Sequence, residues 1–310
     1  MKKILSLIFV LVLGVVLVGC KPTGNVVEDH QIKVYTRDTT SGTRDGFFSV
    51  IGFKDAVADN TVLVEGYVEV DGNGAMITSV EGDEYGIGYI SLSSYLDTDL
   101  KGLLYENVEP TEENVVNETY KLTRNFNYAI RDNNETVEGQ IIKAFVAYMG
   151  TKEGKATIKG ADGIVATSAS DPSWGDIKSE HPVVEQDNSA VEVKFGGSTS
   201  VEKVAKALSA DFKGKAGNFT PIHNHTGSGD AFKRVQGSEK DGADKLDIGF
   251  ASREFKLTDG EALAADTFGK LCTDAIVVVV NEKNTTLTKI TAAQLKSIYD
   301  GTVTKWEDME

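Results

Sequence analysis

The apolar residues of this chain recur with two periods, one helical and one strand-like. Apolar stripes at helical spacing lie at 138–149, where Gly150 ends the pattern, and at 201–212 and 295–299. Continuous or alternating apolar runs predict strands at 31–35, 63–70, 86–92, 191–195, 246–250 and 275–280. The last run is apolar throughout, which predicts a central strand buried on both faces. Strands that alternate with helices predict an α/β fold.

Polar residues mark the boundaries of these elements. Thr199 with Glu202, and Thr291 with Gln294, have the spacing of capping boxes and predict helix starts. The segment 71–74, Asp-Gly-Asn-Gly, predicts a turn after the strand at 63–70. The segment 166–189 combines Ser, Asp, Pro and Gly without a sustained apolar period, and we interpret it as a surface linker.

The N-terminus has the pattern of an export signal. Lys2 and Lys3 precede an apolar run at 4–18, which is short for a membrane-spanning helix. The run ends in Leu-Val-Gly-Cys20, which resembles a bacterial lipobox and so implies cleavage before Cys20 and acylation of that cysteine. A plain signal peptide and an uncleaved anchor are the alternatives. Residues 21–32 are polar and predict a flexible tether, so we expect an extracytoplasmic protein held at the membrane by lipid.

The charge balance limits the possible partners. The chain carries 32 basic and 47 acidic residues, a net charge of −15, and loss of the signal would make it still more acidic. Such a protein is a poor nucleic-acid binder and is repelled by anionic lipid. Any bound anion must therefore be held by local donors. Apart from Cys20 the chain has one cysteine, Cys272, beside the apolar run at 275–280, and we expect it to be a buried small hydrophobe.

The segment 37–44, Arg-Asp-Thr-Thr-Ser-Gly-Thr-Arg, is the most informative stretch of the chain. It places Arg37 and four hydroxyl side chains in a turn, and Phe47, Phe48 and Ile51 follow at helical spacing. Free backbone N–H groups and the helix dipole make such a start a ready site for a small anion. An ordinary polar turn with a helix cap is the alternative.

Three other turns share this chemistry. Ser, Thr or Gly follow a strand or begin a helix at 197–200, 227–229 and 251–253, as they do at 41–43. Each could be a simple cap, but four together favour a converging anion cradle at the carboxyl ends of strands. Hydrogen bonds to a charged group each contribute roughly 1.5–3 kcal/mol, so neutral donors suffice to hold a dehydrated oxyanion.

These turns resemble a known set of motifs. The segments 37–43, 195–200, 226–229 and 247–253 are similar to the phosphate-binding motifs of the substrate-binding lipoprotein of phosphate ABC transporters. The segments 298–306 and 145–154 resemble further parts of that family. The resemblance implies a two-lobed, type II periplasmic-binding-protein-like fold. It also implies capture of inorganic phosphate and its delivery to an ABC permease and its ATPase, without catalysis or cofactor, by a monomer.

Carried over position by position, the resemblance implies the phosphate donors Arg37, Ser41, Gly42, Thr43, Thr199, Ser200 and Ser228. Well-known members have an aspartate where Ser252 stands, and that carboxylate accepts a hydrogen bond from hydrogen phosphate and rejects fully ionised sulfate. A serine hydroxyl accepts a hydrogen bond but does not repel sulfate. Ser252 is therefore a ligand candidate that leaves selectivity open, and Arg253 is a further candidate.

The order of the motifs departs from the family. Here the segment at 37–43 opens the chain and the segment ending at Trp306 closes it, so the chain resembles a circular permutation, with a gene fragment as the alternative. We expect one lobe to comprise 33–123 plus 273–310 and the other 124–272. The crossings should lie near 120–127 and 271–277, and Glu310 should lie within roughly 20 Å of Gln31.

Other functions have weaker support in the sequence. A binding protein for another oxyanion, such as sulfate, stays open. A phosphate-ester hydrolase is conceivable from Ser41 or Ser228, but no Gly-x-Ser-x-Gly segment accompanies them. His223 and His225 could bind a metal, yet no acid or cysteine cluster lies near them in the sequence, and we expect no metal site.

Overall fold

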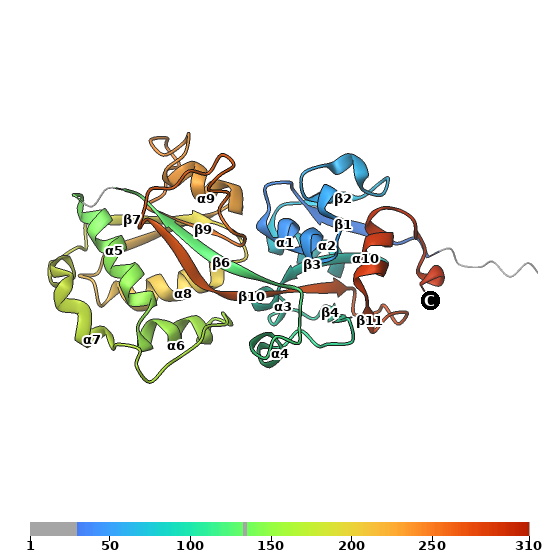
Figure 1. Ribbon diagram of the computed structural model, residues 1–310, viewed down its shortest axis with the longest axis horizontal. Helices are drawn as coiled ribbons and strands as arrows, with labels where there is room; N and C mark the ends of the chain where they lie inside the picture. Colours follow the sequence, from blue (N-terminus) through green and yellow to red (C-terminus); the bar gives the residue numbers. More distant parts are fainter. Residues whose placement is uncertain (1–29, 133–134, 310) are drawn as a thin grey trace, which may run out of the picture.

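The computed structural model describes residues 30–132 and 135–309. The predicted signal, the lipidation site Cys20, most of the tether and Glu310 lie outside these residues. Figure 1 shows two bodies of helices and strands joined by the long strands β6 (Thr123–Ile130) and β10 (Phe268–Val280). No helix within the described ranges is long and apolar enough to cross a membrane.

One sheet runs through both bodies, in the order β2-β1-β3-β10-β6-β9-β7-β8, with β4 also paired to β10. Strand β10 connects the two halves, since its first part pairs with β6 and residues 276–280 pair with β3, both antiparallel. A separate two-stranded sheet joins β11 to β5. The other strands are β1 (Lys33–Arg37), β2 (Val68–Val70), β3 (Gly86–Ser91), β4 (Lys101–Gly102), β5 (Leu104–Tyr105), β7 (Glu192–Gly197), β8 (Thr220–His225), β9 (Ile248–Ala251) and β11 (Lys289–Ile290).

Helices cover the faces of this sheet. Helix α5 ends at Gly150 and α10 begins with the capping box of Thr291 and Gln294, both as predicted. The helices are α1 (Gly42–Val50), α2 (Gly72–Glu81), α3 (Leu92–Tyr95), α4 (Glu112–Val116), α5 (Val137–Met149), α6 (Lys152–Gly160), α7 (Trp174–Ile177), α8 (Glu202–Lys213), α9 (Ser228–Val235) and α10 (Ala292–Tyr299).

The buried apolar side chains form two main cores. The first core draws its members from 34–122 and 275–306, together with Ile164. The second core draws its members from 126–272, and a small satellite cluster packs beneath α9 and β9. The predicted central strand at 275–280 is buried along its whole length, and Cys272 is buried in the second core. The buried thiol has a raised pKa because burial disfavours the thiolate.

The predictions for the segments 71–74 and 166–189 are wrong. The segment 71–74 is not only a turn: Gly72 has a left-handed φ of +82°, and α2 starts there. The segment 166–189 is not an exposed linker throughout, because it carries α7 and short 3-10 turns. Trp174, Val183 and Val184 are buried in the second core, where Trp174 packs against Phe212. Its burial comes from these few apolar side chains, which have no regular period.

The two ends of the described chain meet on the first core. Gln31 forms an antiparallel bridge with Lys305, and the Ile32 N–H donates to the Thr304 carbonyl at 2.8 Å. The His30 imidazole contacts the Glu307 carboxylate. The predicted distance to Glu310 falls outside the described residues.

Candidate functional site

The polar turns singled out in the sequence converge where the two bodies meet. On the first core, Arg37 ends β1 and Ser41–Thr43 begin α1. On the second core, β7 leads into the turn 198–200, Ser228 begins α9, and Ser252 follows β9. Strands β1 and β3 are parallel to each other, as are β7 and β9, so in each body the carboxyl ends of the strands share one edge.

A chain of hydroxyl groups links these turns. The Ser252 hydroxyl lies 2.9 Å from the Ser198 hydroxyl and 3.1 Å from that of Ser228. Between the two bodies, Thr43 Oγ1 lies 3.1 Å from Ser200 Oγ. All five side chains are buried. The structure thus brings together hydroxyl groups that are up to 157 residues apart in the sequence.

The backbone of Gly42 packs directly against Ser228 and Ser252 of the other body. A Cβ atom on Gly42 would lie 2.6 Å from the hydroxyl oxygens of both Ser228 and Ser252, and 2.8 Å from a Ser252 backbone carbon. Only glycine fits this approach. Next to it, Ser41 is the N-cap of α1, and its hydroxyl accepts a long hydrogen bond of 3.4 Å from the Arg44 N–H. Ser41 therefore acts as a helix cap, which is the alternative interpretation of the segment 37–44.

Arg37 is a buried cation with unused donor capacity. Its side chain is 1% exposed, its Nε donates to the Val70 carbonyl at 3.2 Å, and its Nη1 has no hydrogen-bond partner. Desolvation lowers the pKa of Arg37, and the positive charge of the nearby Arg124 lowers it further. Tyr89 and Asp38 act in the opposite direction and raise it. A buried cation with a free N–H group favours an anion beside it.

Thr199 does not form the helix cap that the sequence predicts. Helix α8 begins at Glu202 with Val201 as its N-cap and no side-chain cap, so the predicted capping box does not form. The Thr199 hydroxyl is instead buried without a partner. An unpaired buried hydroxyl costs stability unless it gains a hydrogen bond, and this makes Thr199 a stronger ligand candidate.

Sequence reasoning missed Asn73, near the start of α2. Its Nδ2 lies 3.0 Å from Ser91 Oγ and 3.1 Å from Ser200 Oγ, so it connects the two bodies, and its Oδ1 is buried without a partner. The predicted turn at 71–74 hid this role. The only signal in the sequence is an asparagine three residues after the end of a strand.

Arg124 and Asp274 were also missed. They are paired opposite each other on β6 and β10, with Nε–Oδ2 and Nη2–Oδ2 distances of 3.1 and 2.9 Å. Both are buried, and Arg124 Nη1 and Asp274 Oδ1 have no partner. Desolvation raises the pKa of Asp274 to about 6, against the opposing effect of Arg124. A separation of 150 residues left no local pattern to reveal the pair.

Two further candidates are engaged elsewhere. The Arg253 guanidinium holds Glu261 in a two-pronged pair, at 2.8 and 2.7 Å, so the structure does not aim it at the hydroxyl groups. His223 contacts Ser209 at 2.9 Å and His225 at 3.1 Å, and burial lowers the pKa of both imidazoles, that of His223 to about 4. Among the described residues no group of three or more His, Cys, Asp or Glu could hold a metal ion.

Known proteins resemble this chain in sequence and in structure. A family described as the PBP superfamily domain matches residues 178–310. The phosphate-binding protein PstS 2 of Streptococcus agalactiae serotype V is 27% identical over 315 residues, covering 99% of this chain and 98% of that protein. PstS 2 of Streptococcus pneumoniae serotype 4 is 27% identical over 316 residues, covering 100% and 99%.

A solved structure shares the fold. The crystal structure of a phosphate ABC transporter, phosphate-binding protein from Streptococcus pneumoniae matches with a TM-score of 0.62 and 25% identity, covering 90% of this chain and all of that one. The alignments run through nearly the whole of both chains, and the expected circular permutation is not confirmed. The predicted α/β fold of the periplasmic-binding-protein type is confirmed. The chain thus has a PBP-like fold.

Proposed function

We propose that this protein binds inorganic phosphate and delivers it to an ABC importer. One observation carries the proposal: Arg37 Nη1, at the end of β1, and Thr199 Oγ1, in the turn after β7, are buried without partners. The turns at these strand ends also contribute hydroxyl groups that meet between the two bodies. An oxyanion accepts hydrogen bonds on every side, and it would supply the acceptors that these donors lack. The phosphate-binding names of the relatives support the same ligand.

The two cores support a hinged mechanism. We propose two lobes, 33–123 plus 273–310 and 124–272, with β6 and β10 as the crossings between them. Arg37, Gly42 and Thr43 would lie on one lobe, and Thr199, Ser200, Ser228 and Ser252 on the other. Closure over phosphate would complete the donor set, and the permease would recognise the closed form.

The proposed setting is extracytoplasmic, with Cys20 as the lipid anchor and the protein acting as a monomer. An ABC permease and its ATPase would be the partners. Catalysis has little support in the geometry, because Ser228 contacts Ser252 and no carboxylate or imidazole among the described residues hydrogen-bonds to its hydroxyl. An acyl- or phosphoryl-transfer serine requires such a base.

Calorimetric titration tests the proposed ligand directly. The mature chain without lipid should bind inorganic phosphate at one site, and a phosphate monoester should be neither bound as tightly nor hydrolysed. Sulfate serves as the matched oxyanion. Failure of phosphate to bind, tighter binding of sulfate, or turnover of the ester would each overturn the proposal.

Ser252→Asp should change selectivity between the two oxyanions. A carboxylate at this position would accept a hydrogen bond from the hydroxyl of hydrogen phosphate but would repel sulfate, which has no proton to donate. We expect sulfate affinity to fall at least about tenfold more than phosphate affinity, a difference of about 1.4 kcal/mol. The neutral variant Ser252→Asn, similar in size, is the control. Equal losses for both anions in the Asp variant would contradict the assigned position of residue 252.

A further inference from the structure

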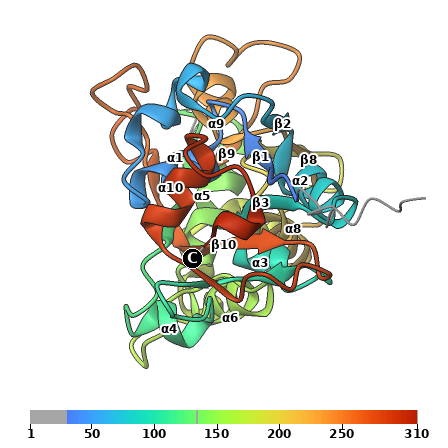
Figure 2. The same ribbon diagram turned by 90° about the vertical axis from the view of Figure 1, so that its right-hand side faces the viewer.

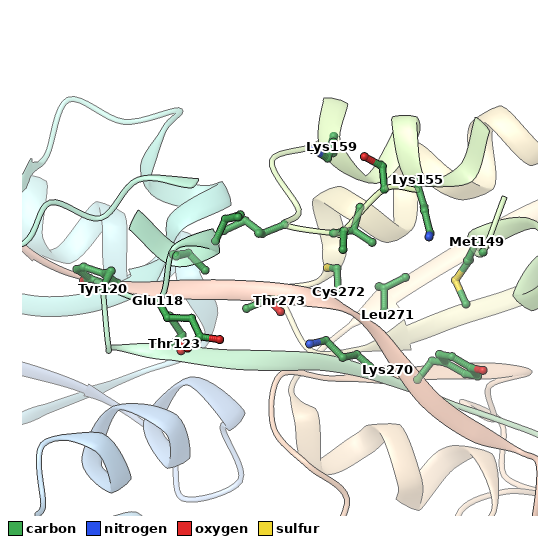
Figure 3. A pocket seen from close by; sticks show the side chains of 18 of the residues that line it. Glu118, Tyr120, Thr123, Met149, Lys155, Lys159, Lys270, Leu271, Cys272 and Thr273 are labelled. Atoms are coloured by element: carbon green, nitrogen blue, oxygen red, sulfur yellow. The ribbon is translucent and has the colours of Figure 1, made fainter. Parts of the chain in front are cut away.

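A large groove lies behind the hinge. It has a volume of about 1080 Å³ and draws its walls from both cores and from the two crossing strands (Figure 3). Residues 115–121 line it on the first core, and residues 146–167 line it on the second. Thr123 and residues 270–273 of β10 form its floor. Its volume is slightly above the range of about 300–1,000 Å³ that is typical of small-molecule sites.

The groove and the candidate phosphate site lie on opposite faces of the crossing strands. Side chains alternate along a strand. Thr123 and Thr273 line the groove, whereas their neighbours Arg124 and Asp274 point the other way, with Arg124 Cβ 3.6 Å from the position of a Cβ on Gly46 of α1. Figures 1 and 2 show α4 and α6 on one side of β10, and α1 and α9 on the other.

The charge of the groove is opposite to that of the chain. Its lining holds four lysines and one acid, Glu118, although the whole chain has a net charge of −15. Lys155 pairs with Asp171 at 2.6 Å, and Lys159 pairs with Glu112 at 3.4 Å. The ammonium groups of Lys121 and Lys270 make no hydrogen bond or ion pair within the described part of the chain. Two cations are therefore available to an anionic group.

The rest of the lining is largely apolar. Val146, Met149, Ile164 and Leu271 line the walls, and Val116 is 65% exposed at the rim. An apolar lining next to unpaired cations is complementary to a molecule that joins an anionic head to a hydrocarbon body. A small inorganic anion would leave the apolar walls in contact with water.

We propose that this groove binds a single-chain anionic amphiphile, such as a medium-chain fatty acid, and that its occupancy favours the phosphate-bound form. The first half of the proposal stands alone, and the second half rests on the proposed function. The head group would lie at Lys270 on the groove floor, with Lys121 farther along the groove, and the chain would pack along the apolar walls.

The coupling follows from the position of the hinge. Thr43 and Ser200 are in contact on the site face while the groove is open on the other face. Rotation that separates the lobes at the phosphate site would narrow the groove behind the hinge. A groove ligand would therefore oppose opening and tighten phosphate binding. By linkage, phosphate would tighten binding of the amphiphile by the same factor.

The probe is decanoate below its micelle-forming concentration, titrated into the phosphate-free mature chain by calorimetry. Butyrate lacks the long chain, and decyltrimethylammonium has a similar chain with the opposite charge. We expect decanoate alone to bind, and phosphate to raise its affinity at least about fivefold. Binding of phosphatidylglycerol vesicles without binding of decanoate, or equal binding of the cationic probe, would overturn the proposal.

Substitutions of exposed side chains test where decanoate binds and leave the buried cores unchanged. Lys121→Glu combined with Lys270→Glu should weaken decanoate binding at least about tenfold, while Lys54→Glu, an exposed lysine outside the groove, should not. Val116→Asn should weaken it as well, with the exposed Leu96→Asn as its control. Unchanged decanoate binding by the double lysine variant would refute the proposed site. Decanoate binding that leaves phosphate affinity unchanged would refute the coupling. A chain that binds decanoate but not phosphate would refute the proposed function instead.

Discussion

Arg37→Ala should lower phosphate affinity by about 2–5 kcal/mol, the usual cost of removing one member of a desolvated, charge-assisted pair. The Arg37 side chain is 1% exposed, and its free Nη1 lies in an interior from which water is excluded. Removing the guanidinium deletes the only full positive charge among the ligand residues carried over from the family. Calorimetry with phosphate measures the loss.

Two variants separate charge from geometry. Arg37→Lys should restore little of the phosphate affinity, because an ammonium group is a point charge. It cannot both donate to the Val70 carbonyl and supply the second N–H group that Nη1 offers to the anion. Arg253→Ala is the matched control, since its guanidinium is occupied by Glu261. Near-normal affinity in Arg37→Ala together with a large loss in Arg253→Ala would reverse the assignment.

The elements that could be predicted from the sequence are those with a long, regular apolar period. Helix α5, helix α10 with its capping box, and the buried run at 275–280 were identified in this way. Helix α2 was missed because its first residues, Gly72, Asn73 and Gly74, are typical of a turn. The positive φ at Gly72 shows that the chain does turn there before the helix begins.

The residues of the candidate site also differ in how far the sequence reveals them. Its turns could be identified because each is a local string of residues, as in the segment at 41–43. Asn73, Arg124 and Asp274 could not, because their roles depend on contacts made across the fold. Thr199 was assigned to a cap that does not form, and its unpaired hydroxyl became evident only when the start of α8 was known.

Arg124→Met should destabilise the native state, and the loss should grow with pH. The variant leaves the Asp274 carboxyl buried without its cation. In the wild type, the pKa of Asp274 is raised to about 6, above its ordinary value of 3.8. The native state therefore binds this proton more tightly than the unfolded state does. The associated stability is present at low pH and is lost as the pH rises through about 6.

Loss of Arg124 should raise the pKa of Asp274 further, because the guanidinium is what favours the ionised carboxylate. The decline in stability should then continue above pH 6, with a slope of about 1.4 kcal/mol per pH unit for one proton. By pH 8 we expect a deficit of about 3–5 kcal/mol relative to the wild type, the usual cost of breaking a buried pair. Urea unfolding of both proteins at several pH values in phosphate-free buffer measures it.

The double variant Arg124→Met with Asp274→Asn tests the cause. It removes both charges, so no carboxyl remains to take up a proton on folding, and the added pH dependence should disappear. Most of the stability at pH 8 should return, because a neutral pair in this position carries no unpaired charge. A double variant as unstable as Arg124→Met at pH 8 would show that contacts of the whole arginine side chain with α1 and Phe126 support the crossing strands. The charge pair would then have no measurable part in holding β6 against β10.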